Sequence, residues 1–173
     1  YENTIIIFAG DNGLAVGQHG LMGKQNVYEH SVGVPLMIKA AAQHTGKKTA
    51  DLCYLIDVFP TLCDMLQLPV PQSVDGISLL SSLDGKEPVR DYLYYSYMDN
   101  QRGISDGTWK LIEYHVNGKR TTQLFNLKND PWERNDLSGQ KKYEKTIQRL
   151  REKMAEEQKR TNDTSVFWNN FSY

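Results

Sequence analysis

A continuous apolar run near the start of the chain sets the first constraint on its fold. Residues 4–9 read Thr-Ile-Ile-Ile-Phe-Ala and end at Gly10. A short, β-branched run without polar interruptions is typical of a strand covered on both faces, as in the centre of an α/β sheet. A glycine-rich loop follows, and a second apolar strand is expected over residues 34–39. The first half of the chain is therefore predicted to belong to an α/β fold.

This run starts almost at the first residue, Tyr1, without a methionine, a leader or a polar lead-in. We therefore expect the chain to lack an N-terminal part of a longer protein. The absence of a signal peptide then leaves the compartment open.

The next segment, residues 51–68, has apolar side chains on one helical face. A proline in a helix interior removes a hydrogen bond and clashes with the preceding turn. We therefore expect a break near Asp57 and a second helix that Pro60 opens.

The second half of the chain alternates instead between apolar and polar residues, which is typical of antiparallel sheet. Asn117-Gly118 is a strong hairpin signal, and Asp106-Gly107 marks a second tight turn. We expect about four strands, from residues 92–97 to residues 123–127, followed by a helix with a charged, solvated outer face. In the strand over residues 109–115 one face is expected to carry Trp109, Leu111, Glu113 and His115, and the other Lys110, Ile112 and Tyr114. The helix is expected to bury Tyr143, Ile147, Leu150 and Met154.

The overall charge is close to balanced, with 20 basic and 21 acidic residues and a formal net charge of -1. Such a balance gives no field that would favour nucleic acid or an anionic membrane as a partner. No apolar run is long enough to cross a bilayer. We therefore expect a small-molecule partner.

The chemistry is expected at Asp11 and Asn12, which follow the first strand directly. In open α/β sheets ligands collect beyond the carboxyl ends of the strands. Carboxylate and amide oxygens are ligands for a hard cation such as calcium or magnesium, although two of them cannot hold an ion alone. The alternative is that Asp-Asn-Gly only makes a turn.

Lys24 ends the glycine-rich loop, where its ammonium group could hold an anion. The loop is not a nucleotide-binding phosphate loop, because Gln18 and Gln25 stand where that motif needs glycine and Ser or Thr. His19 has no second histidine at metal-ligand spacing, which argues against zinc. His30 is expected to be a structural residue of a helix.

Together these segments resemble the sulfatase family, in the right order and over nearly the whole chain. Residues 3–13 and 17–39 resemble its second signature region, and residues 57–66 and 75–80 the helix and segment that follow. Residues 103–112 and 124–137 resemble its C-terminal subdomain. The resemblance implies the C-terminal part of an alkaline-phosphatase-like α/β/α sandwich, plus a small antiparallel sheet with a packed C-terminal helix. It also implies two domains, the C-terminal part of the catalytic domain over residues 1–88 and a C-terminal subdomain over residues 89–173.

By position, Asp11 and Asn12 resemble calcium ligands of that family and Lys24 resembles the lysine that grips the sulfate. His19 resembles a histidine that could contact the substrate or act as an acid near the leaving group. The family nucleophile is a formylglycine made from Cys or Ser in a Cys/Ser-x-Pro/Ala-x-Arg motif. Cys53 and Cys63 stand in no such motif. We therefore expect the nucleophile in the missing N-terminal part, with this chain alone inactive.

The resemblance implies a sulfuric ester hydrolase that acts on a small-molecule or carbohydrate sulfate ester and is exported to the periplasm, the lysosome or the outside of the cell. Two alternatives stay open. One is a phosphate or phosphonate monoester hydrolase of the same superfamily. The other is a non-catalytic carbohydrate-binding module made of the aromatic sheet and the terminal helix. Arg102, at the head of the sheet, is a weaker candidate for contact with a sulfated sugar.

Overall fold

The computed structural model describes residues 3–40, 46 and 48–165. The chain divides into two compact units. Unit 1 consists of residues 1–11 and 34–93, and unit 2 of residues 12–33 and 94–173. The segment 12–33, which carries the glycine-rich loop, therefore packs with the second half of the chain. The expected domain division at residue 88 stays a prediction.

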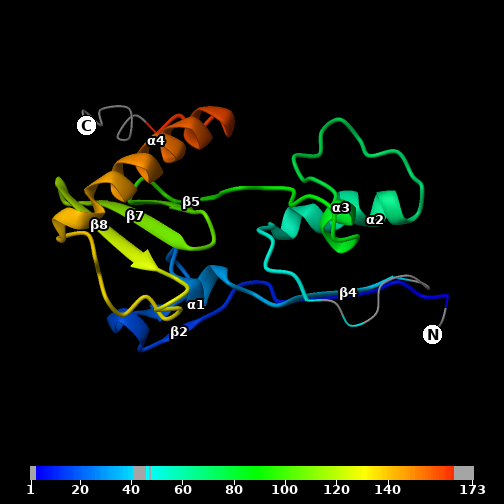
Figure 1. Ribbon diagram of the computed structural model, residues 1–173, viewed down its shortest axis with the longest axis horizontal. Coiled ribbons are helices and arrows are strands. Elements are labelled where there is room, and N and C mark those ends of the chain that lie inside the picture. Colours follow the sequence, from blue (N-terminus) through cyan, green and yellow to red (C-terminus); the bar gives the residue numbers. More distant parts are fainter. Residues whose placement is uncertain (1–2, 41–45, 47, 166–173) are drawn as a thin grey trace. The chain divides into compact units, whose positions relative to one another are not determined.

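Unit 2 is built on the predicted antiparallel sheet, whose four strands follow one another in the order β5-β6-β7-β8 (Figure 1). The longest pairing joins β7 and β8, with Leu111 opposite Leu124. Asn117 and Gly118 both have positive φ, 52° and 75°, as a two-residue hairpin turn requires. The meander and this turn are therefore confirmed. The strands are β5 (Leu93–Tyr97), β6 (Gln101–Ser105), β7 (Trp109–Val116) and β8 (Lys119–Asn126).

Both faces of this sheet are covered. The helix α4 (Glu144–Arg160), preceded by the 3-10 helix η3 (Lys141–Tyr143), packs against β6 and β7. It buries Ile147, Leu150 and Met154, as predicted, whereas Tyr143, the fourth residue predicted for this face, lies in η3 and is only partly buried. Beneath the opposite face Val27 and Tyr28 form a core cluster with Ile112 and Phe125. The alternation along β7 therefore separates two buried faces.

The segment 12–33 forms a small hairpin and one helical turn. Its elements are β2 (Ala15–Val16), the 3-10 helix η1 (Gln18–Gly20), β3 (Met22–Gly23) and α1 (Glu29–Val32). The strands β2 and β3 pair antiparallel, with Ala15 opposite Gly23. This hairpin carries the candidate residues His19, in its turn, and Lys24, just after its paired end.

In unit 1 the first apolar run forms β1 (Ile6–Ala9), which pairs antiparallel with β4 (Leu36–Lys39). The expectation that this strand is covered on both faces is wrong for this chain, because Phe8 is 56% exposed and Ile6 is also exposed. The reason is that, among the described residues, β4 is the only strand beside β1 and no layer covers the pair.

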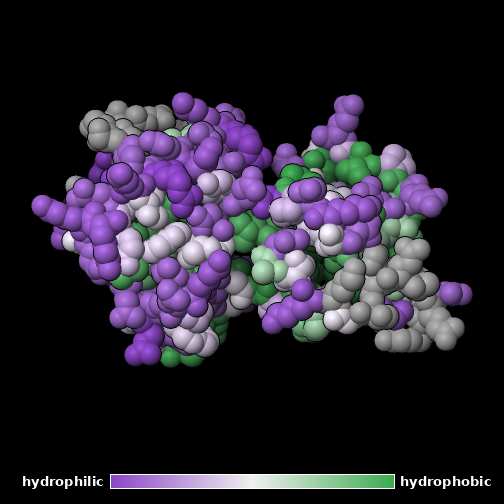
Figure 2. Space-filling model, in the orientation of Figure 1, coloured by the Kyte–Doolittle hydropathy of each residue, from purple (hydrophilic) through white to green (hydrophobic). Residues whose placement is uncertain are grey.

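The helical part of unit 1 is shorter than predicted. It comprises the 3-10 helix η2 (Leu55–Asp57), α2 (Val58–Met65) and α3 (Leu80–Leu83). The 3-10 helix runs directly into α2 at Asp57, the position of the expected break, but α2 begins at Val58, so Pro60 lies in its first turn and does not open it. Hydrophobic side chains gather at the surface over α2 and α3, whereas the surface over α4 is hydrophilic (Figure 2). None of the helices in the described ranges has the length and apolar character of a membrane span.

Candidate functional site

Asp11 and Asn12 follow β1 after Gly10, and both are exposed. Asp11 belongs to unit 1 and Asn12 to unit 2. The Nδ2 of Asn12 donates a hydrogen bond to the carbonyl oxygen of Ser31 at 3.4 Å, and the backbone N–H of Gly13 donates to the same oxygen at 3.0 Å. This double contact fixes the amide group of Asn12 through its nitrogen and leaves its Oδ1 as an acceptor.

Gly13 is required for this docking. A Cβ atom at this position would lie 1.9 Å from the carbonyl oxygen of His30, far inside van der Waals contact. Gly13 does not have a positive φ. Its function is therefore close approach to the backbone of α1, and Asp-Asn-Gly is more than a surface turn.

The hairpin of β2 and β3 carries the other two candidates at opposite ends. Lys24 directly follows the paired residue Gly23, at the end of the hairpin where Asn12 leads into β2. His19 lies in the turn, in the left-handed conformation with φ 53°, closed by a hydrogen bond from the N–H of Gly17 to the carbonyl of Leu21. The structure therefore brings Lys24 to the end of the hairpin near Asn12 and His19 to the other end.

The ring of His19 is held by two other rings. It stacks on Tyr28 with centroids 3.9 Å apart and planes 4° apart, and His30 lies 5.5 Å from His19. The Tyr28 hydroxyl donates to Oε1 of Gln123 at 2.7 Å. Burial, together with repulsion from His19 and Lys110, lowers the pKa of His30 below its ordinary value. His30 lies in α1, as expected, and favours the neutral form.

A buried ionic cluster, which we call the Lys110 cluster, lies between β7, α1 and the loop after β8. Lys110 on β7 is fully buried and lies 2.7 Å from Glu29 Oε1 and 3.1 Å from Glu133 Oε1. Glu133 Oε2 accepts the backbone N–H of Glu29 at 2.6 Å. Burial raises the pKa of Glu133, although Lys110 opposes this. The cluster anchors both α1 and the loop after β8 to the sheet.

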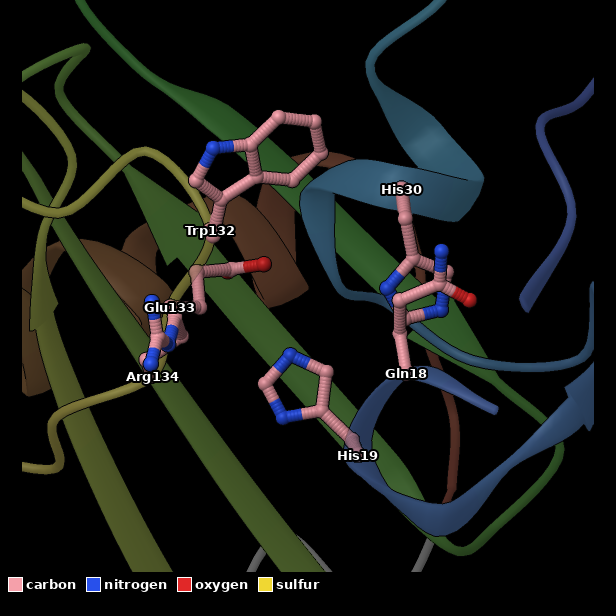
Figure 3. A pocket seen from close by; sticks show the side chains of 6 residues that line it. All are labelled: Gln18, His19, His30, Trp132, Glu133 and Arg134. Carbon is pink, nitrogen blue, oxygen red and sulfur yellow. The ribbon is translucent and has the colours of Figure 1, made fainter. Parts of the chain in front are cut away.

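A pocket of about 580 Å³ opens between the hairpin turn and that loop. Gln18, His19 and His30 line one side, and Trp132 and Arg134 line the other, with Glu133 between them (Figure 3). The resemblance covers residues 124–137 but predicts no role for Trp132, Glu133 or Arg134. The available signal was an aromatic residue and an arginine directly after the Asp130-Pro131 turn.

A metal site cannot be completed from the described residues alone. No group of three or more His, Cys, Asp or Glu side chains among them has metal-binding geometry. The donor set at Asp11 and Asn12 nevertheless fits calcium, because both supply oxygen and Asn12 Oδ1 is left as an acceptor. The remaining oxygens of a calcium shell would have to come from elsewhere in the protein.

Arg102 does not have the surface role considered for it. Its side chain is buried, and its Nε lies 2.6 Å from Asp163 Oδ2. Its NH1 also donates to the carbonyls of Met98 and Gln101. Arg102 therefore anchors the residues after α4 to the sheet.

Comparison with known proteins identifies the relatives of this chain. Residues 17–160 match the family model described as N-sulphoglucosamine sulphohydrolase, C-terminal. The N-acetylglucosamine-6-O-sulfatase of Bacteroides thetaiotaomicron is 30% identical over 94% of this chain and 31% of the relative. A solved structure of a protein with its substrate D-glucosamine-2-N,6-O-disulfate has a TM-score of 0.76, with 29% identity over 94% of this chain and 35% of that one.

The same fold occurs in a phosphonate monoester hydrolase from Silicibacter pomeroyi, with a TM-score of 0.78 and 23% identity over 96% of this chain and 37% of that one. The chain spans about a third of the length of the relatives it matches. The predicted fold class is confirmed, with a four-stranded antiparallel sheet and a C-terminal helix in an alkaline-phosphatase-like protein. Since the family match covers most of the chain, it belongs to the sulfatase family, as the C-terminal portion of such a protein.

Proposed function

We propose that this chain is the C-terminal part of a sulfuric ester hydrolase and supplies its residues for calcium and sulfate. The single observation that carries the proposal is the docking of Asn12 and Gly13 on the Ser31 carbonyl. It holds the Asn12 amide by its nitrogen, so the Oδ1 of Asn12 is left as an acceptor for a cation. A loop that served only as a turn would not need this fixed orientation.

The chemistry assigned to each residue follows from its group. The carboxylate of Asp11 and the Oδ1 of Asn12 would be calcium ligands, and a bound calcium ion would stabilise negative charge on the sulfate oxygens. The Lys24 ammonium group would hold the sulfate as a point charge. The formylglycine that attacks sulfur would belong to the remainder of the protein.

His19 is proposed to contact the substrate. Its stacking on Tyr28 and its place in the hairpin turn, at the end opposite Lys24, favour contact with a part of the substrate beyond the sulfate. A role as acid near the leaving group is the less favoured of the two, because Lys24 is proposed to hold the reacting sulfate at the other end of the hairpin.

A carbohydrate sulfate ester is the proposed substrate class. The relatives include an N-acetylglucosamine-6-O-sulfatase and a protein solved with a disulfated glucosamine. By analogy with the family, the protein would be exported.

The phosphonate monoester hydrolase is the second candidate, since such a protein shares the fold. Asn12 argues against it, because a histidine at this position would suit the transition metals of phosphatases, whereas an amide oxygen suits calcium. The presence of Asp11, Asn12 and Lys24 together argues against a non-catalytic module.

The test uses the full-length protein with 4-nitrophenyl sulfate and phenylphosphonate esters as substrates. We expect calcium-dependent hydrolysis of the sulfate, and a loss of kcat/KM of about 10²–10³-fold in Asp11→Ala and in Lys24→Met, the usual cost of removing one group that stabilises transition-state charge. Lys128→Met, at an exposed lysine of unit 2, is the matched control and should retain activity.

Preference for the phosphonate ester, or unchanged sulfate turnover in Asp11→Ala, would contradict the proposal. The 173-residue chain alone should show no turnover of the aryl sulfate. Turnover by the chain alone would remove the need for a nucleophile from another part of the protein.

A further inference from the structure

We infer that the pocket between Trp132, Arg134 and His19 is a subsite for an anionic sugar ring other than the ring that carries the reacting sulfate. The inference rests on the proposed function for the class of substrate. It concerns a different part of the molecule from Asp11, Asn12 and Lys24. Four observations on the pocket carry it.

The loop that forms one wall is held in a strained conformation. Glu133 has φ 53°, in the left-handed region that a non-glycine residue adopts only at a cost of about 1–3 kcal/mol. Its side chain is buried, held by Lys110 and by the N–H of Glu29. The neighbours on both sides, Trp132 and Arg134, are exposed. Strain of this kind, fixed by a buried cluster, is typical of binding sites.

Trp132 presents a large apolar surface to the pocket. It is 66% exposed, although an indole ring is among the side chains that gain most from burial. The pocket volume of about 580 Å³ lies within the usual range for small ligands. The C–H face of a pyranose ring would cover the indole ring while its hydroxyl groups stay in water.

Arg134 gives the pocket its preference for an anion. No salt bridge joins its guanidinium group to a carboxylate in the described part of the chain, although Asp130 lies near enough for the charge of Arg134 to lower its pKa. The carboxylate of Glu133 turns to Lys110, and that of Asp130 accepts the backbone N–H of Asn135 at 2.7 Å. A guanidinium group binds carboxylate and sulfate in a bidentate manner.

The opposite wall supplies hydrogen-bonding groups on a rigid support. His19 is fixed by its stacking on Tyr28, and Gln18 and His30 complete the wall. His30 Nε2 is buried without a hydrogen-bond partner in the described structure. Glu133 is the single acidic side chain of the lining; it pairs with Lys110, which it shares with Glu29, and burial raises its pKa toward the neutral form. The pocket as a whole therefore favours a negatively charged, polar ligand.

The place of the pocket separates it from the proposed sulfate-binding residues. It lies at the turn of the β2–β3 hairpin, whereas Lys24 follows the paired end. We therefore assign the pocket to a neighbouring sugar of an oligosaccharide, with either a sulfate or a carboxylate group on Arg134.

The experiment measures binding to the 173-residue chain, by calorimetry and by tryptophan fluorescence. The probes are glucosamine 6-sulfate, glucuronate and neutral N-acetylglucosamine. We expect a Kd of roughly millimolar for at least one anionic sugar, with at least about tenfold weaker binding of the neutral sugar. The stronger of the two anionic probes identifies the group that Arg134 accepts.

Three variants and a control test the residues. Arg134→Gln and Trp132→Ala should each raise Kd at least about tenfold, about the effect of 1.4 kcal/mol, and Trp132→Phe should remove the fluorescence change. Arg160→Gln replaces an exposed arginine near the end of α4 and should bind as the wild type. Equal binding of neutral and anionic sugars, or an unchanged Kd in Arg134→Gln, would overturn the inference.

The result is independent of the proposed hydrolase activity. If the full-length protein cleaves no sulfate ester but binding still depends on Arg134, the proposed function fails and the subsite stands. If hydrolysis occurs while Arg134→Gln leaves Kd unchanged, the subsite fails and the proposed function stands.

Discussion

The two units each contain a buried ionic cluster, and the two clusters serve different purposes. In unit 1 the fully buried Asp57 accepts two hydrogen bonds from Arg90, at 2.7 and 2.8 Å, and one each from the N–H groups of Tyr54 and Ile77. All of its partners lie within residues 54–90. We call this group the Asp57 cluster. It closes one short stretch of chain on itself.

The Lys110 cluster of unit 2 instead joins three segments that are far apart in the sequence. Lys110 and Glu29 are 81 residues apart, and Glu29 and Glu133 are 104 apart. Two of the joined segments carry candidate functional residues, Asn12 by way of α1 and Trp132 with Arg134. The comparison teaches that a buried charge in this protein can either stabilise a unit or position groups for binding, depending on which segments it joins.

Breaking the Asp57 cluster should cause the largest loss in the free energy of unfolding. Asp57→Ala leaves the nearly buried guanidinium group of Arg90 without its carboxylate and two N–H groups without an acceptor. We expect a loss near the upper end of the about 3–5 kcal/mol typical of breaking a buried ion pair. Chemical denaturation would measure the loss of stability. Hydrogen exchange should show lost amide protection in residues 54–90 and unchanged protection in the loop 127–140. Equal loss in both regions would deny that the cluster is local.

Removal of Lys110 should lower the free energy of unfolding somewhat less, but it should affect segments that are farther apart in the sequence. Lys110→Met keeps most of the stem volume, and the Glu29 side chain is 31% exposed and can turn to water. We therefore expect a loss near the lower end of the same range, about 3 kcal/mol.

Where in the chain the stability is lost tests the function of the Lys110 cluster better than the size of the loss. Protection should fall around Glu29 and Glu133, and binding of the anionic sugar should weaken although neither Trp132 nor Arg134 has changed. Adding Glu133→Gln to Lys110→Met should restore part of the stability, because the unpaired buried carboxylate is removed. A double variant no more stable than Lys110→Met would show that Glu133 contributes no charge effect.

The smallest expected effect is a pH dependence in the Lys110 region. The folded pKa of His30 lies below its unfolded value of about 6.5, so the unfolded chain binds the proton more readily. Stability should therefore fall as pH drops through about 6.5 and be unaffected by His30 above it. His30→Gln should reduce this acid loss in urea titrations at pH 5.5, relative to pH 8. An unchanged difference between the two pH values would exclude His30 as its source.

Local patterns were enough to predict the sheet and its helix. The alternation along β7 assigned Glu113 and Lys110 to opposite faces of the strand, and the structure agrees, with Glu113 2.7 Å from Arg151 of α4 and Lys110 2.7 Å from Glu29. The spacing of Ile147, Leu150 and Met154 gave the buried face of α4. The two faces of β7 and the buried face of α4 could be predicted because each follows the repeat of one kind of element, strand or helix, over residues close in sequence.

The buried charges could not be predicted in this way. Lys110 alternates with apolar residues, but its partners carry no signal that relates them to it over such distances. The charged face of α4 was expected to be solvated, whereas Arg149 and Arg151 reach Asp106 and Glu113. At the candidate site, the resemblance supplied Asp11, Asn12, His19 and Lys24, and their roles stay predictions. The docking of Gly13 on α1 became visible only in three dimensions.

The shortness of α1 has a consequence for how the protein becomes structured. A helix of four residues cannot persist alone in water, because the first turn fixes several residues for a single hydrogen bond. Its external contacts reach Lys110 and Glu133, and its N-cap residue Tyr28 contacts Gln123. Residues 12–33 leave the ribosome before the sheet that follows them, yet they can become ordered only after that sheet has formed. During refolding, pulse-labelled amides of β7 and β8 should therefore be protected before those of the segment that carries Asn12 and Lys24.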